Sequence, residues 1–357
     1  MTRAERAEFV VVGAGITGLS AAWALARRGR EVLVLEQAAV GHRSGGSQGS
    51  CRIFRLGYEH AEYVRLAKRA RALWSELEAA SGDRLLHPVP QLTFGSQMDQ
   101  VHEAMRAEGA SCELLTIQQA AERFPGVAAS GPVLLEPESA VIAADKALAA
   151  LDRLSQQVRC GVRVTALAEQ GRGVRISTTH GDIEADRVIV CAGPWSAGLL
   201  CGTGVDVPGA ATLEQVAYLK DAGDLPIVVH YGGEFPYGLP EPGSGRYKIG
   251  IHHGGPDVDP DRQVHSEDPA LAERIERAAR TLLPTTDPRP VASERCVYDN
   301  SPDTDFIVDR DGSIVVGCGT SGHGFKFGPL LGEWLADLAI GSPAAARVPA
   351  RFGLARF

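Results

Sequence analysis

The apolar positions near the start of the chain follow the pattern of a strand, a helix and a second strand. Residues 9–12 and 31–35 are short, mostly apolar runs, and residues 17–28 between them have helical periodicity. Such runs are typical of strands buried on both faces, and Gly29 is a residue type that commonly ends a helix. The pattern therefore predicts a βαβ unit.

The same reasoning extends along the rest of the chain. Strands are predicted at residues 91–94, 133–136, 162–164, 174–177, 187–191 and 314–316, with several short strands between 216 and 253. Helices are predicted at residues 66–77, 145–156, 268–283 and 330–339. Gly82 closes the first of these helices, and Asp268 followed by Pro269 starts the third. Thr116 and Gln119 have the spacing of a capping box, which predicts a further small helix.

The order of these elements predicts an α/β fold with a second, α+β domain. Strand–helix–strand pieces at both ends and in the middle would form a Rossmann-like nucleotide-binding domain. The antiparallel-looking strands between them would form a sheet that binds a substrate. We place the nucleotide-binding domain at residues 1–84, 145–206 and 296–357, and the substrate-binding domain at residues 85–144 and 207–295.

Composition narrows the class of protein. The 357 residues, 44% of them hydrophobic, suffice for a large core, and the formal charge of −8 argues against nucleic acid or an anionic membrane surface as a partner. No apolar run reaches the roughly 20 residues of a membrane span, and no secretory apolar segment is recognisable. Seven cysteines, never spaced C-x-x-C, indicate reduced thiols rather than a disulfide framework or a zinc site. We expect a cytoplasmic monomer or small homo-oligomer.

A glycine-rich turn joins the first predicted strand to the first helix. Gly13, Gly15 and Gly18 have the G-x-G-x-x-G spacing that brings the backbone close to a pyrophosphate at a helix N-terminus. Glu36 ends the next strand, where an acid can accept hydrogen bonds from a ribose and repel a 2′-phosphate. These positions predict a dinucleotide other than NADP, and a tight turn without a ligand is the alternative.

A second glycine-rich segment, residues 317–322, has the same formal spacing and follows a strand. No second strand ending in an acid follows it at the required distance, so a second Rossmann unit is not predicted. We interpret the segment as a turn whose following helix points its positive end at a flavin ring. A plain connection between elements has the same pattern.

Four further segments carry a family resemblance. They are residues 49–55, 246–252, 295–298 and 321–327, with the sequences GSCRIFR, RYKIGIH, RCVY and SGHGFKF. Together they resemble the monomeric sarcosine oxidase and N-methyltryptophan oxidase family, within the D-amino-acid-oxidase-like flavoproteins. The resemblance covers nearly the whole chain, although the chain is somewhat short for the family. It implies a Rossmann-like FAD-binding domain interleaved with an antiparallel-sheet substrate domain.

The resemblance implies a covalent link between Cys296 and the 8-methyl group of the flavin. By its chemistry alone, Cys296 could instead be a small buried hydrophobic residue, the usual fate of a free cysteine. Arg55 and Lys326 resemble the pair that binds a substrate carboxylate, with a planar fork and a point charge. The alternatives are a solvated arginine and a helix-flanking surface lysine, although Phe325 and Phe327 make the latter less suitable.

The resemblance also implies roles at the reacting end of the flavin. Lys248 resembles the lysine above the ring that promotes the reaction with oxygen, because a fixed cation stabilises developing superoxide. His252 resembles the active-site histidine, and Arg52 resembles the arginine packed against the flavin. Tyr237 and Tyr298 occupy positions where the family places groups near the substrate, although buried tyrosines are often core residues.

Alternation along a strand at residues 246–252 puts Lys248 and His252 on one face, so both can look into one cavity. His253 would point to the opposite face, so the two histidines would not chelate one metal, and no metal site is predicted. An exposed polar face of a half-buried strand is the alternative. The residues expected to contact FAD are Gly13, Gly15, Ile16, Thr17, Gly18, Glu36, Gln37, Arg43, Ser44, Ser47, Arg52, Val164, Ala192, Gly193, Trp195, Cys296, Gly319, Gly322, Gly324, Phe325 and Lys326.

These positions predict a flavin-dependent oxidase of an amino acid, most suited to a secondary amine. The carboxylate would dock on Arg55 and Lys326, and a hydride would leave the carbon next to nitrogen for flavin N5 to give an imine. Oxygen would reoxidise the flavin beside Lys248 and leave as hydrogen peroxide. Two alternatives stay open: a dehydrogenase that passes electrons to a carrier, and a non-catalytic flavoprotein scaffold. The pattern does not specify the substrate side chain.

Overall fold

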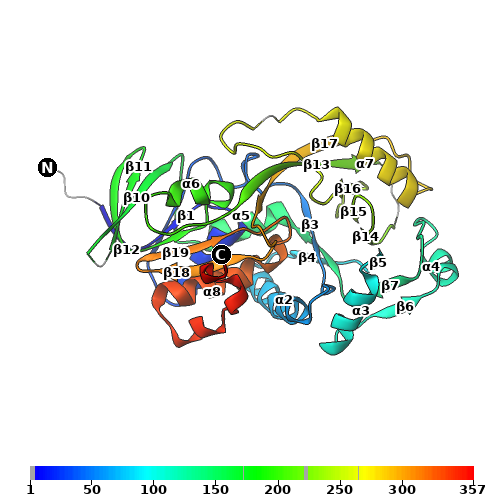
Figure 1. Ribbon diagram of the computed structural model, residues 1–357, viewed down its shortest axis with the longest axis horizontal. Coiled ribbons are helices and arrows are strands. Elements are labelled where there is room, and N and C mark those ends of the chain that lie inside the picture. The colour runs from blue at the N-terminus through cyan, green and yellow to red at the C-terminus, as the bar shows by residue number, and fades with distance from the viewer. Residues whose placement is uncertain (1–4, 172, 221–223, 264) are drawn as a thin grey trace.

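The computed structural model describes residues 5–171, 173–220, 224–263 and 265–357. Figure 1 shows two large sheets, one on the left, near the mark N, and one on the right. The helices are α1 (Ile16–Arg27), α2 (Ala61–Ser81), α3 (Met98–Ala107), α4 (Ile117–Arg123), α5 (Ala144–Leu154), α6 (Ser196–Leu200), α7 (Pro269–Leu282) and α8 (Gly328–Ile340). No helix of the described residues is long and apolar enough to cross a membrane.

The first sheet contains the predicted βαβ unit. Its order is β10-β11-β12-β1-β2-β9, with β19 beside β12 and β18 beside β19. Its strands are β1 (Glu5–Val12), β2 (Val32–Glu36), β9 (Gln157–Cys160), β10 (Val164–Gln170), β11 (Gly173–Thr178), β12 (Gly181–Val190), β18 (Ile307–Asp311) and β19 (Ile314–Cys318). β1 pairs in parallel with β2 and β12, and all of β2 is buried, as expected for strands covered on both faces. The βαβ prediction is confirmed.

Helices α1 and α8 pack against each other at very short range. A side-chain carbon on Gly332 would collide with the backbone of Ser20, and one on Gly328 would collide with Ile16. Pro329 lies in the first turn of α8, where its missing N–H costs no hydrogen bond. The helix therefore starts at Gly328 rather than at the predicted residue 330.

The second sheet has the order β17-β13-β16-β15-β14-β5-β7-β6. Its strands are β5 (Gln91–Gly95), β6 (Glu113–Leu115), β7 (Val133–Glu136), β13 (Ala210–Leu219), β14 (Ile227–Tyr231), β15 (Pro236–Pro240), β16 (Tyr247–Ile251) and β17 (Ala292–Asn300). Leu271, Ile275 and Ala279 recur at helical spacing along α7 and pack in one core cluster with Ile249 and Ile251 of β16. One face of this sheet is thus covered by α7, and the other face is left for a site.

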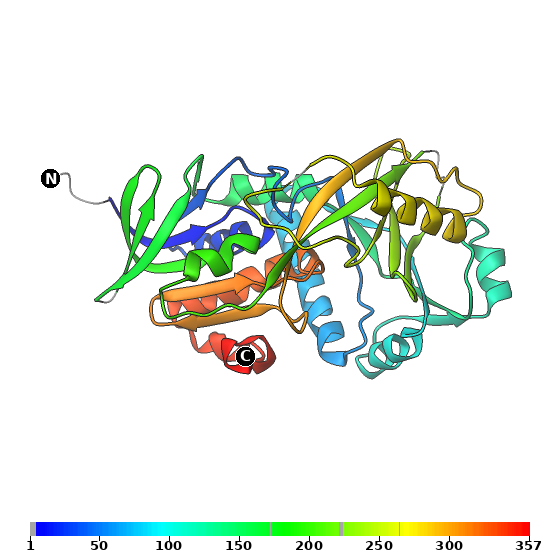
Figure 2. The same cartoon turned by 45° about the horizontal axis from the view of Figure 1, so that its top comes forward.

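A small antiparallel sheet joins the two halves of the fold. It consists of β3 (Cys51–Phe54), β8 (Ala140–Ala143) and β4 (Leu86–Pro88). In Figure 2 these strands lie between the two large sheets, beside α2. Arg52 lies on β3, and Arg55 follows the last residue of this strand. The small sheet therefore brings two of the predicted site residues to the centre of the molecule.

Several predicted boundaries were wrong. The strand expected at 162–164 begins only at Val164, and the one expected at 187–191 is the end of the longer β12.

The capping box of Thr116 and Gln119 is confirmed, with both of its hydrogen bonds present. β17 runs through the predicted domain boundary between residues 295 and 296, and the division of the chain into domains stays a prediction.

Candidate active site

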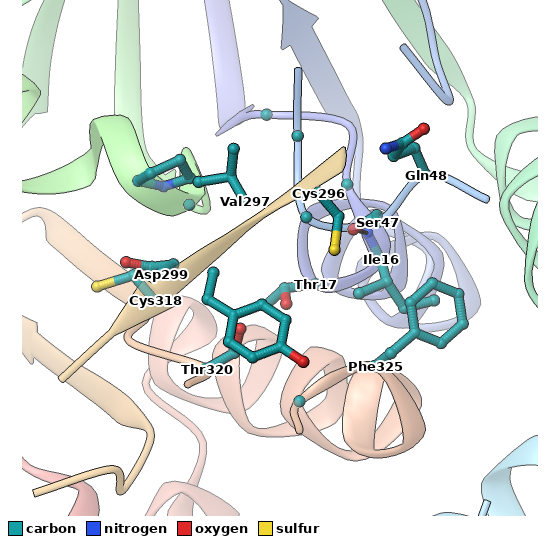
Figure 3. A pocket seen from close by; sticks show the side chains of 18 of the residues that line it. Ile16, Thr17, Ser47, Gln48, Cys296, Val297, Asp299, Cys318, Thr320 and Phe325 are labelled. Carbon is teal, nitrogen blue, oxygen red and sulfur yellow. Dashed lines mark hydrogen bonds between the residues drawn. The ribbon is translucent and has the colours of Figure 1, made fainter. Parts of the chain in front are cut away.

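A cavity of about 780 Å³ is lined by residues of both large sheets. Its walls come from the turn after β1, the ends of β2 and β19 and the loop before α6, together with residues of the strands β13, β15, β16 and β17. This volume lies within the range of about 300–1,000 Å³ that is typical of sites for small molecules. Figure 3 shows side chains from distant parts of the chain converging on it.

The glycines of the first turn shape one end of the cavity. Gly13 has a φ of +101°, and a side-chain carbon there would collide with the carbonyl oxygen of Cys191. Gly18 packs with equal closeness against the carbonyl of Gly13. The N–H of Ile16 donates to Ser47 Oγ at 3.0 Å, so the first turn of α1 is held against the cavity. A helix N-terminus and a tight glycine turn together fit the pyrophosphate of a dinucleotide.

Glu36 lies at the end of β2 and lines the same end of the cavity. The side chain is only 4% exposed, and its carboxylate accepts hydrogen bonds of 2.9 Å from the N–H groups of Ala14 and Ala38. Each carboxylate oxygen can accept a second hydrogen bond. Glu36 is therefore fixed in place and still able to bind a ribose hydroxyl, as the fit to a dinucleotide requires.

Strand register places the reacting groups on one face of the second sheet. Tyr218 of β13 pairs with Lys248 of β16, and Glu214 of β13 pairs with Cys296 of β17. Because side chains alternate, these residues share a face with Tyr298, while the opposite face packs on α7. Lys248 and the neighbouring His252 both line the cavity, which confirms that they look into one space.

Cys296 reaches the cavity from the middle of β17. Figure 3 shows its sulfur directed into the space bordered by Ser47, Ile16 and Phe325. Burial raises the pKa of this thiol, and the positive charges of Arg52 and Lys248 oppose that shift. The cysteine is thus a free thiol on the cavity wall with cations close by.

Arg52 and Lys248 share one carbonyl group. Arg52 Nη1 donates to the carbonyl oxygen of Cys51 at 2.9 Å, and Lys248 Nζ donates to the same oxygen at 3.3 Å. The guanidinium carbon of Arg52 lies 5.5 Å from the ring centre of Phe325. Lys248 is only 5% exposed, and burial followed by the charge of Arg52 lowers its pKa.

Arg55 and Lys326 form a second pair of cations at the cavity wall. Arg55 Nη1 donates to the hydroxyl of Tyr231 at 2.9 Å, and Lys326 Nζ donates to the hydroxyl of Tyr58 at 3.0 Å. Arg55 also lies over the face of Tyr58, with 4.7 Å from the guanidinium carbon to the ring centre. Within the described residues, neither cation forms an ion pair with a carboxylate, although the buried Glu136 acts electrostatically on Arg55. Burial, then the charge of Arg55, holds the pKa of Lys326 well below its usual value.

His252 is an uncharged group of the site. Its Nδ1 lies 3.4 Å from the hydroxyl of Tyr298, and its ring packs edge-on against Phe235. Burial, then the electrostatic effect of His253, lowers its pKa well below the usual value. Alternation predicted that His253 would point to the face opposite to His252, and this prediction is wrong. β16 ends at Ile251, the φ of His253 is +54°, and its ring centre lies 4.2 Å from that of His252.

Most of the predicted site residues meet at this cavity. Those that line it are Gly13, Gly15, Ile16, Thr17, Glu36, Gln37, Ser47, Arg52, Arg55, Val164, Ala192, Gly193, Trp195, Tyr237, Lys248, His252, Cys296, Tyr298, Gly322, Gly324, Phe325 and Lys326. Gly18, Arg43, Ser44 and Gly319 do not belong to its wall. Gly18 lies behind the first turn, and the N–H of Gly319 is turned toward Asp299 Oδ2, 2.6 Å away.

Some residues of the site carried no sequence signal. Tyr58 and Tyr231 orient the two cations from α2's leading loop and from β14, and nothing local in the sequence marks them. Asp261 closes the Val164 end of the cavity, where it accepts hydrogen bonds of 2.8 Å from Arg163 and from the indole N–H of Trp195. Such contacts depend on chain segments that only the fold brings together.

Comparison with known proteins agrees with this geometry. The family described as FAD dependent oxidoreductase matches residues 8–338. Human peroxisomal sarcosine oxidase is 31% identical, over 93% of this chain and 91% of its own length. N-methyl-L-tryptophan oxidase of Yersinia pestis is 30% identical, over 98% and 99%. The solved structure of NikD, described as an unusual amino acid oxidase essential for nikkomycin biosynthesis, aligns with a TM-score of 0.84 at 28% identity, covering 94% of both chains.

The family match covers nearly the whole chain, so the predicted flavoprotein class is confirmed and FAD is the cofactor. The glycine turn, the buried Glu36 and the long cavity are the features of this chain that fit it. The chain therefore belongs to the FAD-dependent oxidoreductase family that includes the sarcosine oxidases and the N-methyl-L-tryptophan oxidases.

Proposed function

We propose that the protein oxidises an amino acid whose amine is secondary, either N-methylated or cyclic, with O2 as the electron acceptor. The observation that carries the proposal is the pair Arg55 and Lys326, a half-buried arginine and a buried lysine on the wall of the cavity that also contains Lys248. Among the described residues, neither cation forms an ion pair with a carboxylate. Buried charges normally have a partner, so this pair fits a ligand with a carboxylate. Two similar proteins are named for N-methyl amino acids, sarcosine and N-methyl-L-tryptophan.

The substrate carboxylate would bind between the two cations. The guanidinium of Arg55 still has donors free of Tyr231 and can form a paired contact with both carboxylate oxygens. Lys326 donates to Tyr58 and to the carbonyl of His323, both at 3.0 Å, which leaves its third N–H for the ligand. The amine would then lie near the neutral His252, which adds no charge that would repel it.

The remaining residues would hold FAD and support its reaction with oxygen. Bound FAD accepts a hydride from the carbon next to nitrogen and passes the electrons on to O2. The turn at Gly13 to Thr17 and the carboxylate of Glu36 would hold the nucleotide, and Phe325 and Arg52 would contact the ring. Lys248 would stabilise the negative charge that develops on oxygen, since a fixed cation in a buried site needs no reorganisation.

We further propose that the Cys296 sulfur bonds to the 8-methyl carbon of FAD. The thiol and the methyl group would each give up one hydrogen, the two electrons would reduce the flavin, and O2 would reoxidise it with release of hydrogen peroxide. Flavin should then stay with the polypeptide after denaturation, and Cys296→Ala should release it. Cys318→Ala is the matched control, because Cys318 is a buried cysteine on the same cavity wall and should leave the link intact. Complete release of unmodified FAD from the denatured wild-type protein would refute the link.

The activity is tested by hydrogen peroxide release with air as the sole acceptor. The screen should cover N-methyl, cyclic and primary amino acids of both hands. We expect peroxide from at least one secondary amine and little from the primary amines. Flavin reduction by such a substrate without peroxide release would instead indicate a dehydrogenase.

A further inference from the structure

Three charged side chains converge over Gly49, in the segment before β3. A side-chain carbon placed on this glycine would lie 3.3 Å from Arg52 Nη1, 3.4 Å from Glu294 Oε2 and 3.8 Å from Lys248 Nζ. The φ of Gly49 is +99°, so the position also disfavours any residue with a side chain. Glu294 therefore brings a carboxylate next to the two cations that face the cavity.

Glu294 is held in this place by the sheet. It lies on β17 two residues before Cys296, so both side chains are on the cavity face, and its strand partner is Val216 of β13. Two residues further along β13, the hydroxyl of Tyr218 donates to Glu294 Oε2 at 2.8 Å. Lys248 Nζ lies 5.8 Å from the ring centre of the same tyrosine. Tyr218 thus lies between the two residues, with its hydroxyl hydrogen-bonded to Glu294 and its ring near the ammonium of Lys248.

The other charged groups around this point are few. Asp145, at the start of α5, accepts the backbone N–H of Gly49 and is a second acid near Arg52 and Lys248. The thiols of Cys51 and Cys296 lie close to the lysine as well. On the far side of Tyr218, Arg246 lies over the ring and pairs with Glu241 at 2.6 Å. The centre therefore combines two cations, Arg52 and Lys248, with two acids, Asp145 and Glu294.

We propose that Glu294 is a positioning residue for the oxygen reaction: its carboxylate, fixed by Tyr218, keeps Lys248 protonated beside Arg52. The proposal rests on the proposed function, because Glu294 acts only through Lys248. Two like charges in a buried place repel each other, and the lysine is the one that can lose its proton. Burial, then Arg52, lowers the pKa of Lys248, and this shift is opposed by Cys51, then Cys296, then Glu294.

The decisive variant is Glu294→Gln, which keeps the shape and the acceptor for Tyr218 but removes the charge. The protonation of Lys248 can be followed directly in the oxidised holoenzyme by NMR of labelled lysine side chains, because the chain has only five lysines: Lys68, Lys146, Lys220, Lys248 and Lys326. Lys248→Met assigns the signal. We expect Glu294→Gln to move the Lys248 titration to lower pH. Flavin reoxidation by O2 should fall about 10-fold at alkaline pH, where the variant loses the Lys248 proton before the wild type does, while anaerobic reduction by substrate stays within about twofold.

Glu241→Gln is the matched control, since it removes a carboxylate that is paired with Arg246 over Tyr218 and is not among the three groups nearest Gly49. It should leave the lysine titration in place, and Glu294→Asp should restore most of the wild-type profile. An unshifted Lys248 signal with an unchanged oxygen profile in Glu294→Gln would overturn the role of Glu294. If Lys248→Met itself does not slow reoxidation, the proposed oxygen site is what fails, and the NMR result still decides whether Glu294 controls the lysine charge.

Discussion

Arg55 and Lys326 are costly residues for the protein without its substrate. Both are held by tyrosine hydroxyls and a backbone carbonyl rather than by an acid, within the part of the chain that the structure describes. A charge removed from water needs an opposite charge in contact with it, whereas Glu136 acts on Arg55 without forming an ion pair. A carboxylate ligand would supply a direct partner for both cations. The same contacts explain why the two side chains are directed to one place, since Tyr58 contacts both.

Arg55→Ala and Lys326→Ala should therefore each weaken the binding of substrate and of simple carboxylate inhibitors. A hydrogen bond to a charged group contributes roughly 1.5–3 kcal/mol, so the dissociation constant should rise about 10- to 150-fold. Titration of the flavin absorbance with a carboxylic acid measures this. Arg65→Ala, an exposed arginine paired with Glu108, should bind as the wild type does. Equal affinity in all three variants would place the carboxylate site elsewhere.

Among single elements, the turn after β19 shows how backbone geometry sets a side chain. Gly322 has a φ of +74°, and a side-chain carbon there would collide with the ring of Tyr298. Gly82 at the end of α2 has the same φ but open space around it. Gly322→Ala and Gly82→Ala should therefore both lose about 1–2 kcal/mol of folding stability from the left-handed backbone. They differ in the collision with Tyr298, which only Gly322→Ala creates.

We expect Gly82→Ala to lower the stability alone and to keep full activity per folded molecule. Gly322→Ala should in addition displace Tyr298 and, through its contact with His252, raise the KM for substrate about 10-fold, since leaving a buried polar group without its partner costs about 1–3 kcal/mol. Thermal unfolding and steady-state kinetics on both variants make the comparison. Matching KM values for the two would mean that the fit of Gly322 against Tyr298 has no part in the site.

Local patterns were sufficient for some of these elements and not for others. The βαβ unit could be predicted because its strands are buried on both faces, and the capping box because it lies within four residues. The pairing of β13 with β17 joins distant parts of the chain, and no local pattern specifies the register. The position of Lys248 on the cavity wall was predictable from alternation and resemblance, whereas the position of Glu294 depends on that register. Alternation also failed for His253, because it holds only inside the strand.

At the scale of the whole molecule, the site lies where the two large sheets and the small third sheet meet. The unfavourable free energy of placing charged side chains there is therefore offset by the stability of the whole fold. The pKa of Lys326 is lower in the folded protein than the usual value of about 10.4. The unfolded chain then binds a proton that the folded protein lacks, so this lysine makes the free energy of unfolding rise with pH in the window between the folded pKa and about 10.4.

Lys326→Met should consequently be more stable than the wild type near pH 7, by about 0.5–2 kcal/mol, and should show a weaker rise of stability as the pH increases toward about 10.4. Lys68→Met, at an exposed lysine, is the control and should change neither. Urea unfolding across this pH range without substrate gives both values. A destabilised Lys326→Met protein with an unchanged slope would contradict the account of an unbalanced buried charge.

The central claim is that this chain reduces O2 with electrons from an amino acid, and Lys248→Met tests it most directly. Stopped-flow measurements should follow anaerobic flavin reduction by substrate and reoxidation by O2 separately. We predict that reoxidation slows by about 10²–10³-fold, because one preorganised charge is lost, while reduction changes far less. An unchanged rate with O2 would contradict the account and would favour a dehydrogenase that uses another acceptor.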